Sequence, residues 1–325
     1  MRIFSGIRPT GEIHIGNYLG AIKQWVELQE KHDCVFSIVD LHAITTPYKP
    51  EVLQKYIFEL TSAYLAAGVD PKKSILFVQS HVKEHTELTW LLGTITPLGE
   101  LKRMTQFKEK SKSHPEYVNA GLLNYPLLMA ADILLYKTDL VPVGKDQEQH
   151  VELAREITRR FNKMFGEVFK EPKALLSKSG QKIMSLQNPK KKMSKTDNPR
   201  GCIEVFDTPE EIQKKIMASV TDPGKTIKYD PKRKPGISNL LLIYSLFSEK
   251  PIKEVEKQFK NAGYEKFKKS LAKLLINSLE PFQKKQKELL KREVYIREIL
   301  DQGAERAKII AGSTMEEVRK KMGLI

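Results

Sequence analysis

Short apolar segments alternate with helical segments over the first 80 residues, and this alternation restricts the possible folds more than any other feature of the sequence. Strands are expected at residues 1–7, 34–39 and 74–79, with apolar positions at helical spacing between them. Gly68 and Pro71 end the second helix before the third strand begins. This order predicts an α/β fold with a Rossmann-like parallel sheet and helices on both of its faces.

The rest of the chain adds one expected strand and many helices. Residues 84–136 read as a helical insertion, residues 139–143 as a strand and residues 147–164 as a helix. Strand signals end near Arg200, and the apolar spacing after it is helical. We therefore predict two domains, an α/β domain over residues 1–198 and an all-helical domain over residues 199–325.

The charge of the chain favours an anionic partner. Its 325 residues include 55 Lys and Arg against 40 Asp and Glu, a net charge of +15, and residues 199–325 hold 27 basic against 18 acidic residues. Such an excess is typical of proteins that bind nucleic acid, nucleotides or lipid headgroups, without choosing among them.

The cysteines and the apolar segments bear on the cell compartment. Cys34 and Cys202 are the two cysteines of the chain, too few for a disulfide framework or a four-thiolate metal site. No apolar run approaches the roughly 20 residues of a membrane span, and the N-terminus lacks the layout of a signal peptide. These features predict a soluble cytoplasmic protein.

Two short stretches carry side chains suited to phosphate. In His14-Ile15-Gly16-Asn17, Gly16 lets a ligand approach the backbone, and His14 and Asn17 can donate to phosphate oxygens. In Lys192-Met193-Ser194-Lys195-Thr196, two lysines can close over a polyphosphate from the polar, basic loop at residues 188–198, expected to be mobile and on the surface. Taken singly, the first is more often an ordinary helix start and the second a solvated basic loop.

Two further stretches have both a structural and a functional interpretation. Asp146, at the end of the strand at 139–143, can cap the next helix in a capping box with Gln149, or contact a ribose or substrate. Asp132 is the one charged residue in residues 127–136. It needs either an internal partner, such as a backbone N–H, Tyr125 or Tyr136, or an apolar ligand with a single N–H, such as indole.

The order and spacing of these stretches resemble a known family. H-I-G-N at 14–17 and K-M-S-K-T at 192–196 resemble the paired HIGH and KMSKS motifs of class I aminoacyl-tRNA synthetases. The stretches that resemble the bacterial tryptophanyl branch of this family are residues 4–11, 104–110, 125–136, 141–144 and 235–240, and the likeness extends from Ile3 to Leu324. The tyrosyl branch, the closest alternative, would carry glutamine where this chain has Leu128.

The chain departs from the family pattern at four positions. Asn17 replaces the second histidine of HIGH, as is common in the tryptophanyl branch, and Thr196 replaces the last serine of KMSKS but keeps its hydroxyl. Arg8 and Lys145 stand where glutamine and glutamate are more usual, which adds positive charge near the expected nucleotide. Some members hold an iron–sulfur cluster on clustered cysteines, and none is expected here.

The resemblance implies a two-step reaction. The carboxylate of L-tryptophan attacks the α-phosphorus of ATP, which gives tryptophanyl-adenylate and pyrophosphate, and the acyl group then passes to tRNA(Trp). Because the nucleophile belongs to the substrate, catalysis consists of positioning and electrostatic stabilisation. The resemblance also implies Mg²⁺ bound with ATP, an anticodon-binding role for residues 199–325, and a homodimer formed through the inserted helices. The sequence shows no carboxylate cluster dedicated to Mg²⁺.

The resemblance further implies roles for individual residues. Lys192, Lys195 and His14 are expected to be catalytic. The residues expected to bind ATP are Arg8, Pro9, Thr10, His14, Gly16, Asn17, Gly144, Lys145, Asp146, Ile183, Lys192, Met193, Ser194, Lys195 and Thr196. The residues expected to bind tryptophan are Asp132 at the indole N–H, Phe4, Val39, Met129, Val141 and Val143 around the ring, and Tyr125 and Gln147 at the polar end.

Two functions of other classes compete with this interpretation. A small-molecule adenylyltransferase has a similar histidine–glycine loop but is usually shorter and lacks a basic helical domain. A non-catalytic RNA-binding protein would account for the charge but has no need of the paired nucleotide motifs.

Overall fold

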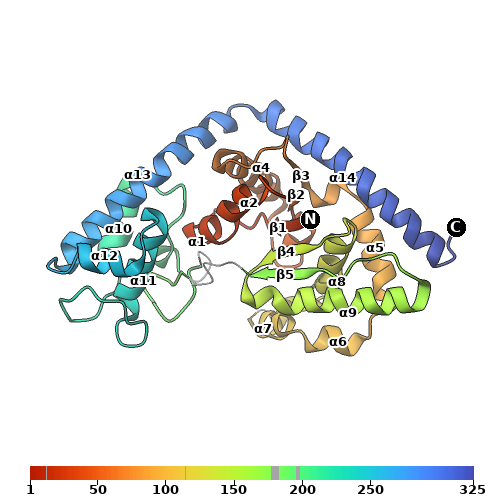
Figure 1. Cartoon of the computed structure of the whole chain (residues 1–325), viewed down its shortest axis with the longest axis horizontal. Coiled ribbons are helices and arrows are strands. Elements are labelled where there is room, and N and C mark those ends of the chain that lie inside the picture. Colours follow the sequence, from red (N-terminus) through yellow and green to blue (C-terminus); the bar gives the residue numbers. More distant parts are fainter. Residues whose placement is uncertain (12, 114, 177–182, 195–197) are drawn as a thin grey trace. The chain divides into compact units, whose positions relative to one another are not determined.

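The computed structural model describes residues 1–11, 13–113, 115–176, 183–194 and 198–325 (Figure 1). Five strands form one sheet in the order β3-β2-β1-β4-β5, and every neighbouring pair is parallel. The strands are β1 (Arg2–Ile7), β2 (Asp33–Ile38), β3 (Ser74–Val78), β4 (Leu140–Val143) and β5 (Lys173–Leu176). The predicted Rossmann-like sheet followed by a helical C-terminal region is confirmed.

The strands β2 and β3 are largely apolar because both faces of the sheet are covered. Every residue of β3 is buried, as are Cys34 to Ile38 of β2. Phe4 of β1 is in register with Val35 of β2. The edge strand β5 was not expected from the sequence, because its four residues are partly exposed and too short to stand out as a strand.

Helices account for most of the remaining described residues. The α-helices are α1 (Ile15–Asn17), α2 (Lys23–Leu28), α3 (Asp40–Ala43), α4 (Pro50–Ala67), α5 (Glu84–Gly93), α6 (Leu98–Arg103), α7 (Thr105–Ser113), α8 (Ala120–Leu134), α9 (Glu148–Phe165), α10 (Pro209–Met217), α11 (Pro235–Ser248), α12 (Ile252–Gln258), α13 (Tyr264–Leu290) and α14 (Glu293–Lys321). A π-helical turn, η1 (Tyr18–Ile22), and the 3-10 turns η2 (Gln79–His81), η3 (Pro115–Tyr117), η4 (Lys145–Gln147) and η5 (Pro199–Gly201) complete the set.

The helices follow the sequence signals with one local difference. α4 begins at Pro50 and ends at Ala67, and its C-cap is Gly68, whose φ of 107° suits glycine. The predicted insertion consists of α5 to α8, between β3 and β4. The segment of helical apolar spacing between the first two strands is not one continuous helix but is divided into α1, η1 and α2, because five residues adopt the wider π-helical turn.

The chain forms two compact units. The sheet unit comprises Met1–Gly11, Gln24–Lys178 and Leu289–Ile325, and the helical unit comprises Glu12–Lys23 and Ser179–Glu288. These bounds differ from the division expected at residue 198, which as a functional division stays a prediction.

The C-terminal helix α14 belongs to the sheet unit because it packs closely on β3. A Cβ on Gly303 would overlap the carbonyl oxygen of Leu76, so only glycine permits this approach. The Thr314 hydroxyl also donates to the Leu135 carbonyl oxygen at 2.7 Å. In the part of the chain that the structure covers, no helix is long and apolar enough to cross a membrane.

Candidate active site

The carboxyl ends of the strands gather most of the predicted site residues of the sheet unit. The chain runs from β1 to β2 and β3 on one side of β1 and then crosses over to β4 on the other side. Ligands bind at such a switch point of a parallel sheet. Residues 8–10 follow β1, residues 39–42 follow β2, Gln79 follows β3 and residues 144–146 follow β4.

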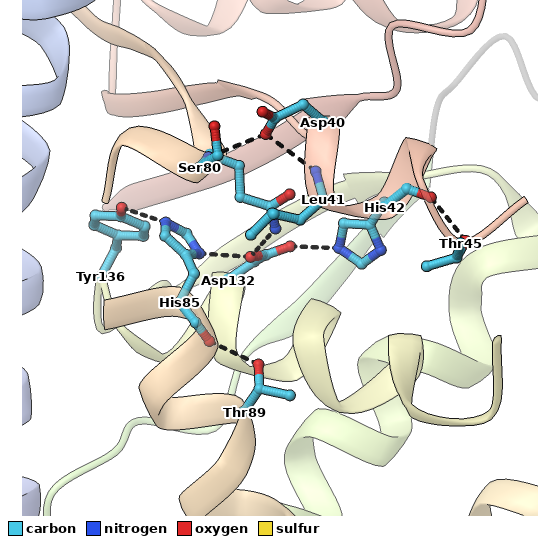
Figure 2. Close-up of polar contacts among 10 residues, drawn as sticks. Asp40, Leu41, His42, Thr45, Ser80, His85, Thr89, Asp132 and Tyr136 are labelled. Atoms are coloured by element: carbon cyan, nitrogen blue, oxygen red, sulfur yellow. Dashed lines mark hydrogen bonds and ion pairs between the residues drawn. The ribbon is translucent and has the colours of Figure 1, made fainter. Parts of the chain in front are cut away.

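Asp132 of α8 lies at the centre of a buried hydrogen-bond cluster (Figure 2). It is 1% exposed. Its Oδ1 accepts from Gln79 Nε2 at 2.6 Å and from His85 Nδ1 at 2.6 Å, and its Oδ2 accepts from His42 Nε2 at 2.8 Å. The residue therefore has internal partners, but the expectation of a backbone N–H or a tyrosine hydroxyl was wrong.

The two tyrosines expected to contact Asp132 bind histidines instead. The Tyr136 hydroxyl lies 2.8 Å from His85 Nε2, so this tyrosine is one residue removed from the carboxylate (Figure 2). The Tyr125 hydroxyl lies 3.0 Å from His150 Nε2, and burial raises the pKa of Tyr125.

The cluster determines the charge of Asp132 and how many of its hydrogen-bond acceptor sites stay unused. Burial has the largest effect and raises its pKa, but the charge and hydrogen bonds of His42 and His85 lower it to about 2. The carboxylate is therefore ionised at neutral pH, and it accepts from both histidines. A carboxylate has about four acceptor sites, two on each oxygen, so three donors leave one site on Oδ2.

Sequence reasoning missed His42, Gln79 and His85. Gln79 directly follows β3, and His42 lies on α3 shortly after the end of β2, and this closeness to a strand end was the one available signal. His85 lies on a helix of the insertion and carries no such signal, since only the packing of α5 on α8 brings it to Asp132.

The residues expected around the indole ring lie in the same unit. Phe4, Val39 and Val141 are buried, while Met129 and Val143 are partly exposed. The ring of Phe4 stacks on that of Tyr136, with centroids 5.5 Å apart. Their role as walls of a tryptophan site stays a prediction.

The end of β4 presents an exposed polar turn. Gly144, Lys145 and Asp146 are exposed, and Asp146 Oδ2 accepts from Gln147 Nε2 at 3.0 Å. The predicted capping box is wrong, because η4 intervenes and α9 starts only at Glu148, with no side-chain cap. Gln149 Oε1 accepts instead from the backbone N–H of Thr105 at 3.0 Å.

After β1, Arg8 and Thr10 are exposed and Pro9 is buried. The backbone N–H of Thr10 donates to the Arg8 carbonyl oxygen at 2.9 Å, which closes a tight turn there.

In the helical unit, His14 is the N-cap of α1. Its Nδ1 accepts from the backbone N–H of Gly16 at 3.0 Å and of Asn17 at 3.3 Å, and its own backbone N–H donates to Asn17 Oδ1 at 3.4 Å. A Cβ on Gly16 would lie 2.8 Å from His14 Cε1, so glycine makes room for the ring. The structural interpretation is thus correct, and no hydrogen bond to Nε2 comes from the described part of the chain.

The charge state of His14 follows from its surroundings. Burial lowers its pKa most, Lys192 lowers it further, and Glu204 partly opposes them, which brings the value to about 4. His14 is therefore neutral at neutral pH. Because Nδ1 accepts, the proton is on Nε2, which can donate to a ligand.

The segment that carries Lys192 folds next to this loop. Met184 and Lys192 form an antiparallel bridge, and the backbone N–H of Met193 donates to the Ile183 carbonyl oxygen at 3.0 Å. Ile183 Cβ lies 4.0 Å from a Cβ built on Gly16. Within the helical unit, the described residues of the two motifs thus lie close together.

Side chains of this segment differ in exposure. Lys192 is exposed and Ser194 partly exposed, but Met193 is 2% exposed, so the expectation of a loop wholly on the surface was wrong at that position. Lys195 and Thr196 lie outside the described residues. Within the described ranges, no group of three or more His, Cys, Asp or Glu residues could hold a metal ion.

Comparison with known proteins identifies the family. The family profile "tRNA synthetases class I (W and Y)" matches residues 1–280. The chain belongs to this family. Among class I synthetases, the tryptophan–tRNA ligase of Caldanaerobacter subterraneus subsp. tengcongensis is 54% identical over 325 residues, which is 100% of this chain and 98% of that protein.

Solved structures of the family agree with this assignment. The tryptophanyl-tRNA synthetase of Mycoplasma pneumoniae has a TM-score of 0.89 and 36% identity, covering 99% of this chain and 97% of its own. That of Campylobacter jejuni, complexed with ADP and tryptophan, has a TM-score of 0.85 and 37% identity, covering 99% and 100%.

Proposed function

We propose that this chain activates L-tryptophan with ATP and transfers the tryptophanyl group to tRNA(Trp), as a tryptophan–tRNA ligase. The observation that carries this function is Asp132, an ionised buried carboxylate with one open acceptor site, in a chain that matches tryptophan–tRNA ligases over its whole length. The tyrosyl alternative is disfavoured, because Leu128 stands where the tyrosyl branch would carry glutamine, so the chain lacks that second polar partner for a phenol hydroxyl.

On the amino-acid side, Asp132 Oδ2 accepts the indole N–H, the one polar group of the ring. Phe4, Val39, Met129, Val141 and Val143 surround the ring, and Tyr125 and Gln147 bind the polar end of tryptophan. The burial of Phe4, Val39 and Val141 supports an apolar site.

On the nucleotide side, two groups of residues are proposed to bind ATP. The first is His14 through Nε2, Gly16, Asn17, Ile183 and residues 192–196. The second is Arg8, Pro9, Thr10, Gly144, Lys145 and Asp146. Lys192 and Lys195 neutralise charge on the departing pyrophosphate.

The reaction needs positioning more than an enzyme nucleophile. The tryptophan carboxylate attacks the α-phosphorus, the bond to the bridging oxygen breaks, and pyrophosphate leaves with the negative charge. Mg²⁺ enters bound to the ATP phosphates.

The wider setting follows from the family and the surface. The basic residues 199–325 bind the tRNA anticodon, and the enzyme acts in the cytoplasm.

Three large apolar side chains of the insertion are exposed, Trp90 at 75%, Leu98 at 53% and Val118 at 47%. A second copy of the chain that covers them would form the expected homodimer.

The test is ATP–pyrophosphate exchange measured with each of the protein amino acids in turn. Exchange with tryptophan alone is expected. Exchange with tyrosine would favour the tyrosyl branch, and RNA binding with no exchange would favour a non-catalytic RNA-binding protein.

A further inference from the structure

Two buried glutamines of the sheet unit differ in how their amides are used. Gln29 Nε2 donates to the Gly68 carbonyl oxygen at 2.8 Å, and Gln29 Oε1 accepts from the Asp70 backbone N–H at 2.9 Å and the Ser74 hydroxyl at 3.2 Å. Both ends of this amide therefore serve the fold.

Gln79 is only half satisfied by the fold. Its side chain is fully buried and Nε2 donates to Asp132 Oδ1 at 2.6 Å, but no donor from the described residues reaches Oε1. A buried amide oxygen without a partner is costly, and a fold that needed only packing here would favour an apolar side chain. The one polar contact of Gln79 is the group expected to select tryptophan.

A hydrogen bond links the turn that carries Gln79 to the helix that carries His42, the donor to Asp132 Oδ2. Ser80, the next residue of η2, donates its backbone N–H to Asp40 Oδ1 at 3.0 Å, and Asp40 begins α3, which carries His42 (Figure 2). Asp40 thus ties the elements that bear the donors to Oδ1 and Oδ2.

We propose that Gln79 is a positioning residue for the selection of tryptophan, which keeps Asp132 Oδ1 filled so that only Oδ2 is left to accept from the substrate. This inference rests on the proposed function. With Gln79 and His85 on Oδ1 and His42 on Oδ2, the carboxylate has a fixed orientation and a single open acceptor site, which matches the single N–H of indole. Without Gln79, Oδ1 would regain an acceptor site for water or a polar ring substituent.

The first experiment replaces the amide by an apolar side chain of similar length. Pyrophosphate exchange is measured with tryptophan and with its analogue that has sulfur in place of the indole N–H. Gln79→Met should lower kcat/KM for tryptophan by about 10- to 100-fold, the range of a hydrogen bond to a charged group, and change that for the analogue much less. The selectivity ratio should fall accordingly.

Gln29→Met is the matched control. It removes a buried glutamine of the same unit whose contacts are structural, so it should lower the melting temperature and leave the selectivity ratio unchanged. The same change of ratio in both variants would overturn the inference.

The second experiment measures the pH dependence of the selectivity ratio, which a change in packing alone would not alter. Gln79→Glu places a carboxyl group on Asp132 Oδ1, where the protonated form donates as the amide does and the ionised form repels. The titratable groups around the pair are His42 and Asp40 from α3, His85 from α5 and Tyr136 after α8. The selectivity ratio of this variant, relative to the unchanged protein, should fall as pH rises from about 6 to about 9.

The outcomes separate this inference from the proposed function. If the unchanged protein shows no tryptophan-dependent exchange, the proposed function fails. If it does, and folded Gln79→Met keeps its selectivity, the positioning role alone is wrong. Should Gln79→Met fail to fold, a selectivity ratio of Gln79→Glu that does not vary with pH overturns the role instead.

Discussion

The carboxylate of Asp132 contributes both to folding and to the proposed selection of tryptophan. Three buried donors, from His42, Gln79 and His85, depend on it. Its removal would leave these donors unpaired in an apolar region, which destabilises the fold. A lower melting temperature is therefore expected of any substitution here, and only selectivity reports on the substrate.

Asp132→Ala should reduce tryptophan activation by about 2–5 kcal/mol, on the scale of a truncated charge pair. Discrimination against phenylalanine should shrink as well, because the acceptor that rejects a ring without N–H is gone. Exchange rates for both amino acids, measured beside thermal unfolding, check this. Asp139→Ala is the control, since Asp139 accepts from the Arg2 backbone N–H and should affect stability alone. A folded Asp132→Ala protein with undiminished selectivity would contradict the assignment.

His14 should make stability depend on pH. Its pKa is about 4 in the folded chain, against 6.5 for an ordinary histidine. Between these values the unfolded chain binds the additional proton, so this contribution is complete above about pH 6.5 and is lost as pH falls toward 4. His14→Asn keeps an acceptor for the cap but does not titrate. Its melting temperature should therefore fall less than that of the unchanged protein between about pH 7 and about pH 5; equal falls would count against a neutral His14.

The same position tests the cap itself. His14→Ala removes the acceptor for two backbone N–H groups and should cost about 0.5–2 kcal/mol of stability. Denaturant unfolding of the alanine and asparagine variants at neutral pH measures the difference.

At the scale of elements, helix α11 holds the segment that carries Lys192. Asn239 accepts from the Met184 backbone N–H at 2.9 Å and donates to the Met184 carbonyl oxygen at 2.8 Å. A Cβ on Gly236 would overlap the Val220 carbonyl oxygen, so this glycine lets α11 approach closely. The stretch at 235–240, known from the sequence only as part of a resemblance, thus has a structural role.

Lys192→Ala should slow adenylate formation by roughly 10²–10³ and leave tryptophan binding nearly unchanged, because its charge is needed as pyrophosphate leaves. The same result is expected for Lys195→Ala. Lys191→Ala is the matched control, as Lys191 is an exposed neighbour with no assigned role. Single-turnover rates and tryptophan affinity, measured separately, decide the matter; parallel losses in both would argue against a role in the reaction step.

At the scale of the whole molecule, the residues expected to bind ATP occur in both compact units. The basic residues after residue 198 are likewise distributed over both units, since α14 belongs to the sheet unit and α10 to α13 belong mostly to the helical unit. The helical unit is therefore the better place to test tRNA binding.

Binding of tRNA(Trp) should weaken steeply with salt, while tryptophan-dependent exchange should respond much less, because phosphate contacts release counterions. Lys273→Glu and Lys285→Glu, both at exposed positions of α13, should each lower the salt slope by about one per lost phosphate contact. Lys72→Glu, exposed in the sheet unit, is the control. Unchanged salt slopes in both α13 variants would show that these positions of α13 do not contact tRNA.

The homodimer predicts an effect at Trp90. Trp90→Glu places a charge on a side chain that is 75% exposed in the single chain and should shift the protein to monomers in sedimentation. Ile309→Glu, at a similarly exposed apolar residue of α14, should not. A protein that is monomeric before any substitution would remove the dimer from the proposal.

The sequence by itself determined the order and type of most elements. β1 to β4, α4, α9 and the helices of the insertion follow from apolar periodicity and from breakers such as Gly68, because these signals are local. The pair of motifs at 14–17 and 192–196 likewise needed no structure, since their resemblance lies in residue type and spacing.

Only the tertiary structure decided which side chains meet. Periodicity identifies a face of a helix but not the element that packs on it. The contact of His85 on α5 with Asp132 on α8 and the hydrogen bonds of Asn239 to Met184 could therefore not be predicted from the sequence. The capping box at Asp146 failed for a related reason, as one 3-10 turn moved the start of α9. Long-range hydrogen bonds depend on how separate elements pack, and that packing is a property of the whole fold.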